Sequence, residues 1–224
     1  MTAALDGDFG GSFPFEPRYL HAGGVRLHYR HRCVAFDHMG FGRSDKPPYL
    51  GGYSLEAHVQ NTLVLMNTWA WELPSFLTPF LREFRTGGLG EILALGGNLF
   101  VESIPGEMHR RDTDPLMMEA YRAPFPDYWS RVAPLAFQRE IPLTERDRSA
   151  ALMGSIHERL PELDQPVLLV WGMRDPVFQP VFLDQWRELF PAARVVELDA
   201  AAHYLVEDEP DAVTAALAEF ANSF

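Results

Sequence analysis

The stretch that decides the fold runs from Val167 to Asp175 and reads Val-Leu-Leu-Val-Trp-Gly-Met-Arg-Asp. Its run of consecutive apolar residues is typical of a strand buried on both faces of a parallel sheet, and we expect that strand at residues 166–171. The glycine and charged residues that follow indicate a loop at residues 172–176. Sheets of this kind bind ligands beyond the carboxyl ends of their strands, so the pattern predicts that Asp175 lies in a functional loop.

A second strand and loop follow with the same organisation. We expect a helix that ends at Phe190, a strand at residues 194–198, a loop that contains His203, and a helix at residues 210–220. The two loops are neighbours, so Asp175 can accept the Nδ1 proton of His203 and leave Nε2 to act as a general base. The ordinary alternatives are an Asp that caps a helix and a His that is only solvated, but the order Asp then His favours a catalytic pair.

The N-terminal third begins with a hairpin pattern and continues into buried strands. Residues 19–22 and 25–29 flank a Gly-Gly turn and predict the hairpin. Residues 33–36 and 62–66 are continuously apolar and predict two strands of the central sheet. The second of these strands begins directly after a short helix that starts at Ser54, with no Gly or Pro between them. This abrupt joint is an anomaly in an α/β pattern.

A long helical segment separates these strands from the Asp175 loop. From residue 73 to residue 160 the chain has helical periodicity, broken by Gly and Pro, and no strand-like alternation. The sequence therefore predicts an α/β protein with a mostly parallel sheet. We expect a core formed by residues 1–72 and 161–224, and an inserted helical cap at residues 73–160.

Composition narrows the classes of partner. The chain has 224 residues, which suits one folded unit, and its net charge of -12 opposes binding to nucleic acid or to an anionic membrane. Cys33 is the single cysteine and cannot form an internal disulfide, and residues 1–11 lack a signal-peptide pattern, so we expect a cytoplasmic location. No apolar stretch approaches the ~20 residues that cross a bilayer. No cluster has metal-ligand spacing, and we expect no cofactor.

Several stretches carry a resemblance to a known family: residues 13–19, 36–47, 172–175 and 202–204. They resemble haloalkane dehalogenases of the α/β-hydrolase superfamily, and the similarity covers nearly the whole chain. The resemblance implies the α/β-hydrolase fold, with Asp175 and His203 as acid and base. It also implies a reaction in which an aspartate displaces halide from carbon and a His-activated water hydrolyses the resulting ester. One departure is Ala202, where the family commonly has Gly.

A second resemblance leaves the substrate open. Residues 139–143 and 171–178 are similar to the β-lactone decarboxylases of olefin biosynthesis, which belong to the same superfamily.

The family's nucleophile is missing from the pattern. α/β-Hydrolases carry it on a turn of the form Gly-x-nucleophile-x-Gly, and no segment here has Ser, Asp or Cys at the centre of such a turn. The family's His-Gly loop is also absent, because Arg30-His31-Arg32 runs directly into Cys33. We therefore predict two internal deletions, at residues 32/33 and 60–62, each of which removes a central strand and a crossover helix.

Other residues are candidates for the missing roles. Asp37 follows a predicted strand and precedes His38-Met39-Gly40, which is superficially similar to a nucleophile turn, although a structural role is favoured. Glu72 lies where some family members carry their acid. Trp69, Trp71 and Trp129 are candidate N–H donors to a halide or substrate, since an indole donates without ionising, but core packing explains aromatic residues as well.

The sequence thus predicts a haloalkane dehalogenase-like hydrolase that acts on a small apolar electrophile through a covalent ester and a His-activated water. The alternatives are a catalytically inactive, internally deleted remnant, a β-lactone decarboxylase, or an epoxide hydrolase relative. The expected partner is a small apolar substrate, with neither nucleic acid nor membrane, and the oligomeric state is left open.

Overall fold

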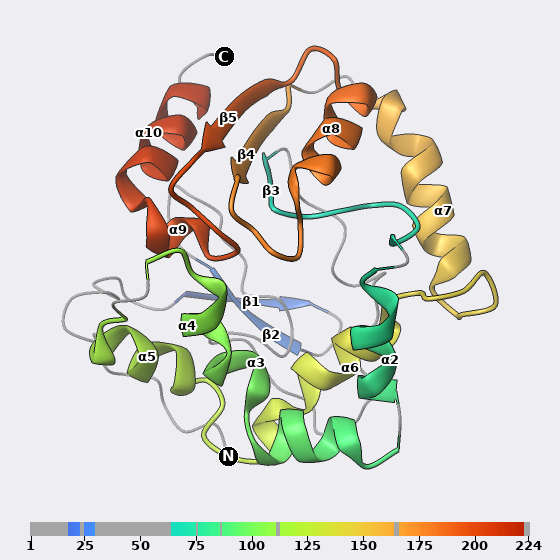
Figure 1. Ribbon diagram of the computed structural model, residues 1–224, viewed down its shortest axis with the longest axis vertical. Coiled ribbons are helices and arrows are strands. Elements are labelled where there is room, and N and C mark those ends of the chain that lie inside the picture. Colours follow the sequence, from blue (N-terminus) through green and yellow to red (C-terminus); the bar gives the residue numbers. More distant parts are fainter. Residues whose placement is uncertain are drawn as a thin grey trace. The chain divides into compact units, whose positions relative to one another are not determined.

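A computed structural model describes residues 18–22, 25–29, 64–74, 76–85, 87–110, 113–163 and 166–221 (Figure 1). The chain divides into two compact units. One contains the described residues of 78–102 and 113–143 together with the N-terminal hairpin, and the other contains those of 64–77, 103–112 and 144–221. The expected division into a core and a cap at residues 73 and 160 stays a prediction.

Among the described residues, a three-stranded parallel sheet organises the second unit. It consists of β3 (Val64–Met66), β4 (Leu168–Gly172) and β5 (Arg194–Leu198), in the order β3-β4-β5. Val64 is opposite Leu168, and Leu168 is opposite Arg194. The predicted strands at 166–171 and 194–198 are confirmed, as is the 62–66 strand over its described residues 64–66.

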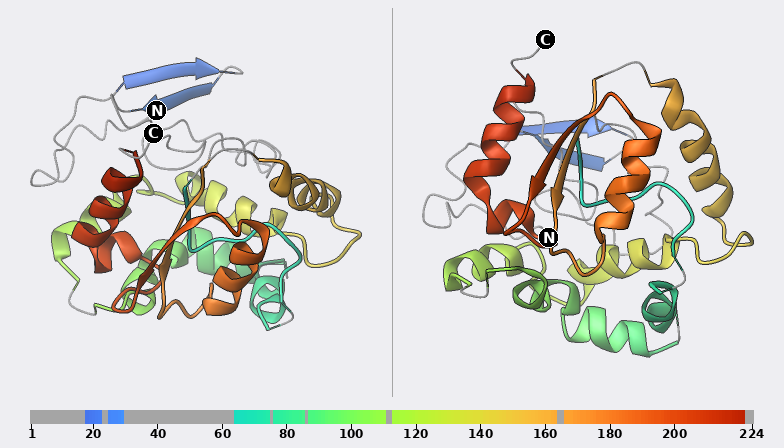
Figure 2. Two further views of the ribbon diagram at one scale, coloured as in Figure 1. Left: turned by 90° about the horizontal axis from the view of Figure 1, so that it is seen from above. Right: turned by 45° about the horizontal axis from the view of Figure 1, so that its top comes forward.

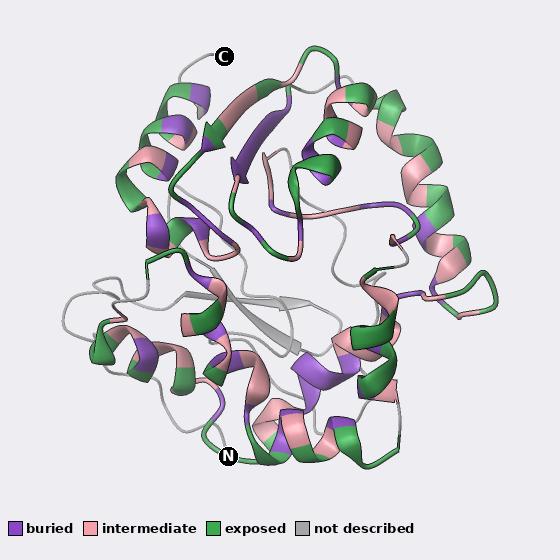
Figure 3. Cartoon of the chain, in the orientation of Figure 1, coloured by how far each residue is buried: buried purple, intermediate pink, exposed green. Residues whose placement is uncertain are grey.

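β4 is the buried centre of this sheet. All of its residues are buried, as its purple ribbon shows (Figure 3). Leu168 and Val170 pack with residues of α9 (Leu205–Asp208) and α10 (Pro210–Ala221) in one apolar cluster. The side chains between them point to the other face because strand residues alternate, and α8 (Pro180–Leu189) also contacts β4. The helices α8 and α10 flank the strands in each view (Figure 2). Continuous burial of this kind requires an apolar strand on both faces, which explains the sequence pattern.

The same unit contains further short helices. These are α4 (Ile104–Glu107), α7 (Ala150–Arg159) and the 3₁₀ turn η5 (Leu160–Glu162). The predicted helices that end near residue 190 and that cover residues 210–220 are confirmed by α8 and α10.

In the first unit, the regular elements among the described residues are the N-terminal hairpin and a set of helices. β1 (Arg18–Ala22) pairs antiparallel with β2 (Val25–Tyr29), which confirms the predicted hairpin. The helical elements are α2 (Thr78–Arg85), η3 (Glu91–Gly96), α3 (Leu99–Glu102), α5 (Pro115–Arg122), η4 (Trp129–Arg131) and α6 (Val132–Glu140). The described residues between 73 and 160 contain no strand, as predicted.

Two buried residues show how this helical core is closed. Phe84 and Leu135 belong to one apolar cluster with residues of η3 and α6. Arg139 spans the cluster, because its Nε donates to the carbonyl oxygen of Phe84 at 2.8 Å and its guanidinium pairs with Glu91 at 2.7 Å.

Some predictions lie outside the described residues. They are the strand at 33–36, the helix that starts at Ser54, and both predicted deletion joints. Within the described part of the chain, no helix has the length and apolar character to cross a membrane.

Candidate active site

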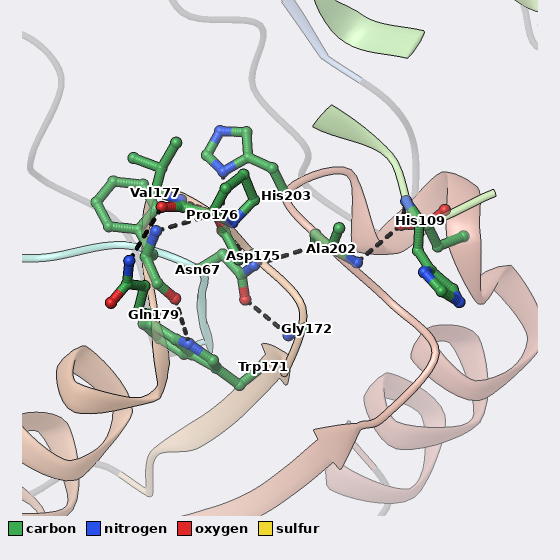
Figure 4. A network of polar contacts seen from close by, with 12 residues as sticks. Asn67, His109, Trp171, Gly172, Asp175, Pro176, Val177, Gln179, Ala202 and His203 are labelled. Atoms are coloured by element: carbon green, nitrogen blue, oxygen red, sulfur yellow. Dashed lines mark hydrogen bonds and ion pairs between the residues drawn. The ribbon is translucent and has the colours of Figure 1, made fainter. Parts of the chain in front are cut away.

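Asp175 and His203 meet at the carboxyl end of the sheet. Asp175 lies in the loop after β4 and His203 lies in the loop after β5. The Nδ1 atom of His203 is 2.8 Å from the Oδ2 atom of Asp175 (Figure 4). The adjacent parallel strands bring two residues that are 28 positions apart in sequence into hydrogen-bond contact. The predicted pair is therefore formed, and its catalytic role stays a proposal.

The carboxylate of Asp175 has donors at both oxygens. Its Oδ1 accepts from the backbone N–H groups of Val177 at 2.7 Å and Phe178 at 3.0 Å, so residues of the same loop bind the carboxylate. Its Oδ2 accepts from the side-chain amide of Asn67 at 2.6 Å in addition to the contact with His203. Asp175 is 3% exposed, and these donors offset the loss of solvation of a buried charge.

This arrangement changes the protonation of His203. Burial of the ring is the largest single effect and lowers the pKa, but the hydrogen bond to Asp175 and the negative charges of Asp175 and Glu107 act in the opposite direction. Together they raise the pKa of His203 above its ordinary value of 6.5. The ring is thus a better proton acceptor than a free imidazole, which suits a general base.

The other ring nitrogen of His203 is free to act. The side chain of His203 is 26% exposed, and Nε2 has no hydrogen-bond partner in the part of the chain that the structure describes. One face of the ring stacks on Phe178, with centroids 5.6 Å apart, and Tyr204 meets the ring edge to face. Neighbouring aromatic rings restrict the imidazole, while Nε2 can take a proton from water.

Asn67 is a site residue that the sequence reasoning missed. It follows β3, is buried, and has a left-handed backbone with φ of 38°, which Asn tolerates better than most residues. Its side-chain amide donates to Asp175 and to the carbonyl oxygen of Ala202 at 3.1 Å, and its Oδ1 accepts from the N–H of Gly172 at 2.9 Å. Asn67 therefore connects the ends of all three strands.

The loops after β4 and β5 also contact each other directly. The N–H of Met173 donates to Leu198 and that of Arg174 donates to Ala201, each at 3.0 Å. A Cβ atom at Gly172 would lie 2.3 Å from the carbonyl oxygen of Ala202. Only glycine allows this close approach, so Gly172 sets the distance between the two loops.

The remaining predicted residues have different surroundings. Trp69 stacks on Phe178 with centroids 5.4 Å apart, and its indole N–H is buried without a partner in the described structure. Trp71 is buried against Trp186 and its N–H likewise has no partner among the described residues. Trp129 belongs to the first unit and is 63% exposed.

The two alternative acids do not take the place of Asp175. Glu72 is exposed, and among the described residues Asp175 is the acid that bonds to His203. Asp37 lies outside the described residues. No group of side chains in the described ranges has the composition and geometry of a metal site.

Comparison with known proteins gives a consistent picture. The family described as alpha/beta hydrolase fold matches residues 59–210. The chain is 31% identical to a cis-3-alkyl-4-alkyloxetan-2-one decarboxylase from Shewanella oneidensis, over 85% of this chain and 73% of that protein. It is 28% identical to haloalkane dehalogenase 2 from Mycobacterium bovis, over 87% of this chain and 80% of that protein.

A solved structure supports the fold. The crystal structure of the haloalkane dehalogenase DbeA from Bradyrhizobium elkani matches with a TM-score of 0.73 at 22% identity. The match covers 92% of this chain and 97% of the other.

The alignment with the decarboxylase also bears on the predicted deletions. It runs over 234 positions, which is more than the whole of this 224-residue chain, although only 85% of the chain takes part. The relative therefore has residues inside the aligned region that have no counterpart here. Internally missing residues are thus supported, and their location at the two joints stays a prediction.

Proposed function

Because the chain belongs to the alpha/beta hydrolase fold family, with haloalkane dehalogenases and β-lactone decarboxylases as relatives, we propose that it is a hydrolase of the dehalogenase type. Its substrate is a small apolar electrophile. The observation that carries the proposal is the Nδ1–Oδ2 contact of 2.8 Å between His203 and the buried Asp175. This contact fixes the tautomer of His203 that leaves Nε2 to accept a proton.

The proposed reaction has two steps. A carboxylate attacks the carbon that bears the halogen, the carbon–halogen bond breaks, and the halide leaves with the electron pair. Water then attacks the carbonyl carbon of the ester while its proton passes to Nε2 of His203. The alcohol leaves with that proton, the carboxylic acid that remains releases the second proton of the water to regenerate the carboxylate, and the net products are an alcohol and a hydrogen halide. Asp175 stabilises the imidazolium that forms between these events.

The attacking carboxylate belongs to a residue other than Asp175, which is bonded to His203. The described residues and the sequence contain no Gly-x-nucleophile-x-Gly turn. Asp37, which lies outside the described residues, is the first residue to test.

Trp69 is the favoured donor to the leaving halide or to a substrate oxygen. Its N–H group is buried and unpartnered in the described structure, and its ring stacks on the same Phe178 that stacks on His203. A buried donor without an acceptor costs about 1–3 kcal/mol, which a bound acceptor would recover. The N–H of Trp71 likewise lacks a partner among the described residues, whereas the exposure of Trp129 does not suit a dry pocket.

Halide release tests the proposal. Purified protein is incubated with a panel of small bromoalkanes, and bromide is measured for the wild type, for His203→Ala, and for Glu145→Ala as an exposed control. We expect release by the wild type and the control, and a loss of at least about 100-fold in His203→Ala. Multiple-turnover release that persists in His203→Ala would contradict the role of His203, whereas a single turnover that ends in the covalent ester would not.

The relative from Shewanella oneidensis favours a second candidate, decarboxylation of a β-lactone. A cis-3-alkyl-4-alkyloxetan-2-one that loses carbon dioxide leaves an alkene, and both products can be measured by gas chromatography. Carbon dioxide and alkene without activity on bromoalkanes would support this candidate over the first.

The unmatched residues of the relative favour a third, a catalytically inactive remnant. Folded protein that releases neither bromide nor carbon dioxide, and that opens no epoxide, would support it. We further propose a cytoplasmic location and no binding to nucleic acid or membranes, in keeping with the net charge of -12.

A further inference from the structure

A second buried carboxylate lies beside the His203 loop. Asp208 is the last residue of α9 and is 5% exposed. Its Oδ2 accepts from the N–H of Ala202 at 2.8 Å and from the N–H of His109 at 3.0 Å, and its Oδ1 accepts from the N–H of Arg110 at 2.8 Å. No step of the proposed reaction uses this group.

The donors come from two segments that are far apart in sequence. Ala202 precedes His203, whereas His109 and Arg110 follow α4, about a hundred positions earlier. The N–H of His203 also donates to the carbonyl oxygen of Glu107 at 3.2 Å. The His203 loop and residues 107–110 are therefore joined by a bridge with Asp208 at its centre.

Helix capping does not explain this geometry. None of the three N–H groups belongs to α9 or to α10, the helices on either side of Asp208. Both oxygens of one carboxyl group accept from the two segments, so Asp208 links residues 109–110 to the His203 loop.

We infer that Asp208 is a positioning residue, which fixes the backbone of the His203 loop and so places the imidazole against Asp175. The peptide groups of Ala202 are held from both directions, because Asp208 binds its N–H and Asn67 binds its carbonyl oxygen. The residue before His203 thus has little freedom to move. The same carboxylate ties residues 109 and 110 to this loop, so that segment and the imidazole keep a fixed geometry.

The inference rests on the proposed role of His203, but its test needs no turnover. The imidazole of His203 is titrated by NMR in the wild type, in Asp208→Asn, and in Asp211→Asn, an exposed neighbour that serves as the control. In Asp208→Asn the amide has one acceptor oxygen left and turns an NH₂ group toward backbone donors. We expect the imidazole pKa to fall toward 6.5, because the pairing with Asp175 loosens while burial of the ring remains.

Kinetics give a second readout if the chain turns over substrate. We expect kcat to fall about tenfold or more in Asp208→Asn with little change in KM, since a small displacement of a base affects the chemical step more than binding. An unchanged titration of His203 in folded Asp208→Asn would overturn the inference. If Asp208→Asn lowers the pKa of His203 as expected but the wild type turns over no substrate, the proposed function alone is overturned.

A wild-type measurement covers the case in which Asp208→Asn does not fold. Hydrogen exchange is followed for the amides of Ala202, His109 and Arg110. We expect all three to exchange with the same opening free energy, because they share one acceptor group. Exchange of Ala202 that is independent of the other two would overturn the inference.

Discussion

Asp175 and Trp69 follow neighbouring strands of one sheet, and their polar atoms are satisfied in opposite ways. Asp175 accepts hydrogen bonds from Asn67, Val177 and Phe178 in addition to its contact with His203. The indole N–H of Trp69 is buried with no acceptor in the described residues. A complete network fixes geometry and adds stability, whereas an unpaired donor lowers stability and can bind a ligand. We therefore expect the two loops to respond differently to substitution.

The largest effect is expected where the loop after β4 touches the loop after β5. Gly172→Ala places a methyl group against the carbonyl oxygens of Ala201 and Ala202, and backbone cannot move aside as a side chain can. We expect the free energy of unfolding to fall by about 3 kcal/mol. Chemical denaturation measures this.

Gly154→Ala is the matched control for that substitution. Gly154 lies within α7 with no atom within 4 Å of the added methyl group, so the same change should raise stability by about 0.5 kcal/mol. Equal effects of the two substitutions would contradict a close contact at Gly172.

The next effect is expected at Asn67. Asn67→Ala removes the bonds to Asp175, Gly172 and Ala202 and places Ala in a left-handed conformation, so we expect a loss of about 2 kcal/mol. Asn67→Gly removes the same bonds without backbone strain, and it should be more stable than Asn67→Ala by about 1 kcal/mol. An Asn67→Ala protein as stable as the wild type would contradict the claim that the hydrogen-bond network around Asp175 adds stability.

The Asp175–His203 pair and Asn67 show what the sequence could and could not predict. Asp175 and His203 were predictable because each follows a predicted strand whose sequence pattern is local. Asn67 also follows a strand, but an amide after a strand is typical of an ordinary turn. Its partners lie 105 to 135 positions away and are set by tertiary structure.

The buried position of Asp208 could not be predicted from the sequence, for a different reason. It lies in the acidic run Glu207-Asp208-Glu209, just before a helix, where carboxylates are usually exposed and favoured by the helix dipole. Its burial follows from the packing of residues 107–110, which no local pattern reports. The predicted strand that corresponds to β4 was confirmed because a strand buried on both faces has a strong apolar pattern, whereas β5 is only partly buried. The division into core and cap depends on long-range contacts and stays a prediction.

A smaller effect is expected from pH. The folded-state pKa of His203 is raised above 6.5, so the protonated imidazole stabilises the folded state. This stabilisation is fully present below pH 6.5 and is lost as the pH rises through the raised pKa. The difference in unfolding free energy between the wild type and His203→Gln should decrease over that window. A difference that grows with pH would contradict the pairing with Asp175.

The smallest effect is expected from the indoles. The N–H of Trp186 donates to the carbonyl oxygen of Thr68 at 2.8 Å, whereas that of Trp69 has no partner in the described structure. Trp186→Phe should therefore cost about 1 kcal/mol more stability than Trp69→Phe, since only the former loses a hydrogen bond. Thermal or chemical denaturation measures the loss of unfolding free energy in the two variants. Equal losses would show that the N–H of Trp69 has a hydrogen-bond acceptor.

The most direct test of the proposed chemistry is intact-mass spectrometry of His203→Ala after incubation with a small bromoalkane. If His203 activates the water that hydrolyses a covalent ester, this variant should accumulate the ester. The protein mass should then rise by the alkyl group less one hydrogen, and peptide mapping should locate the attacking carboxylate. A folded His203→Ala protein without any adduct, beside a wild type that releases no bromide, would contradict the proposal.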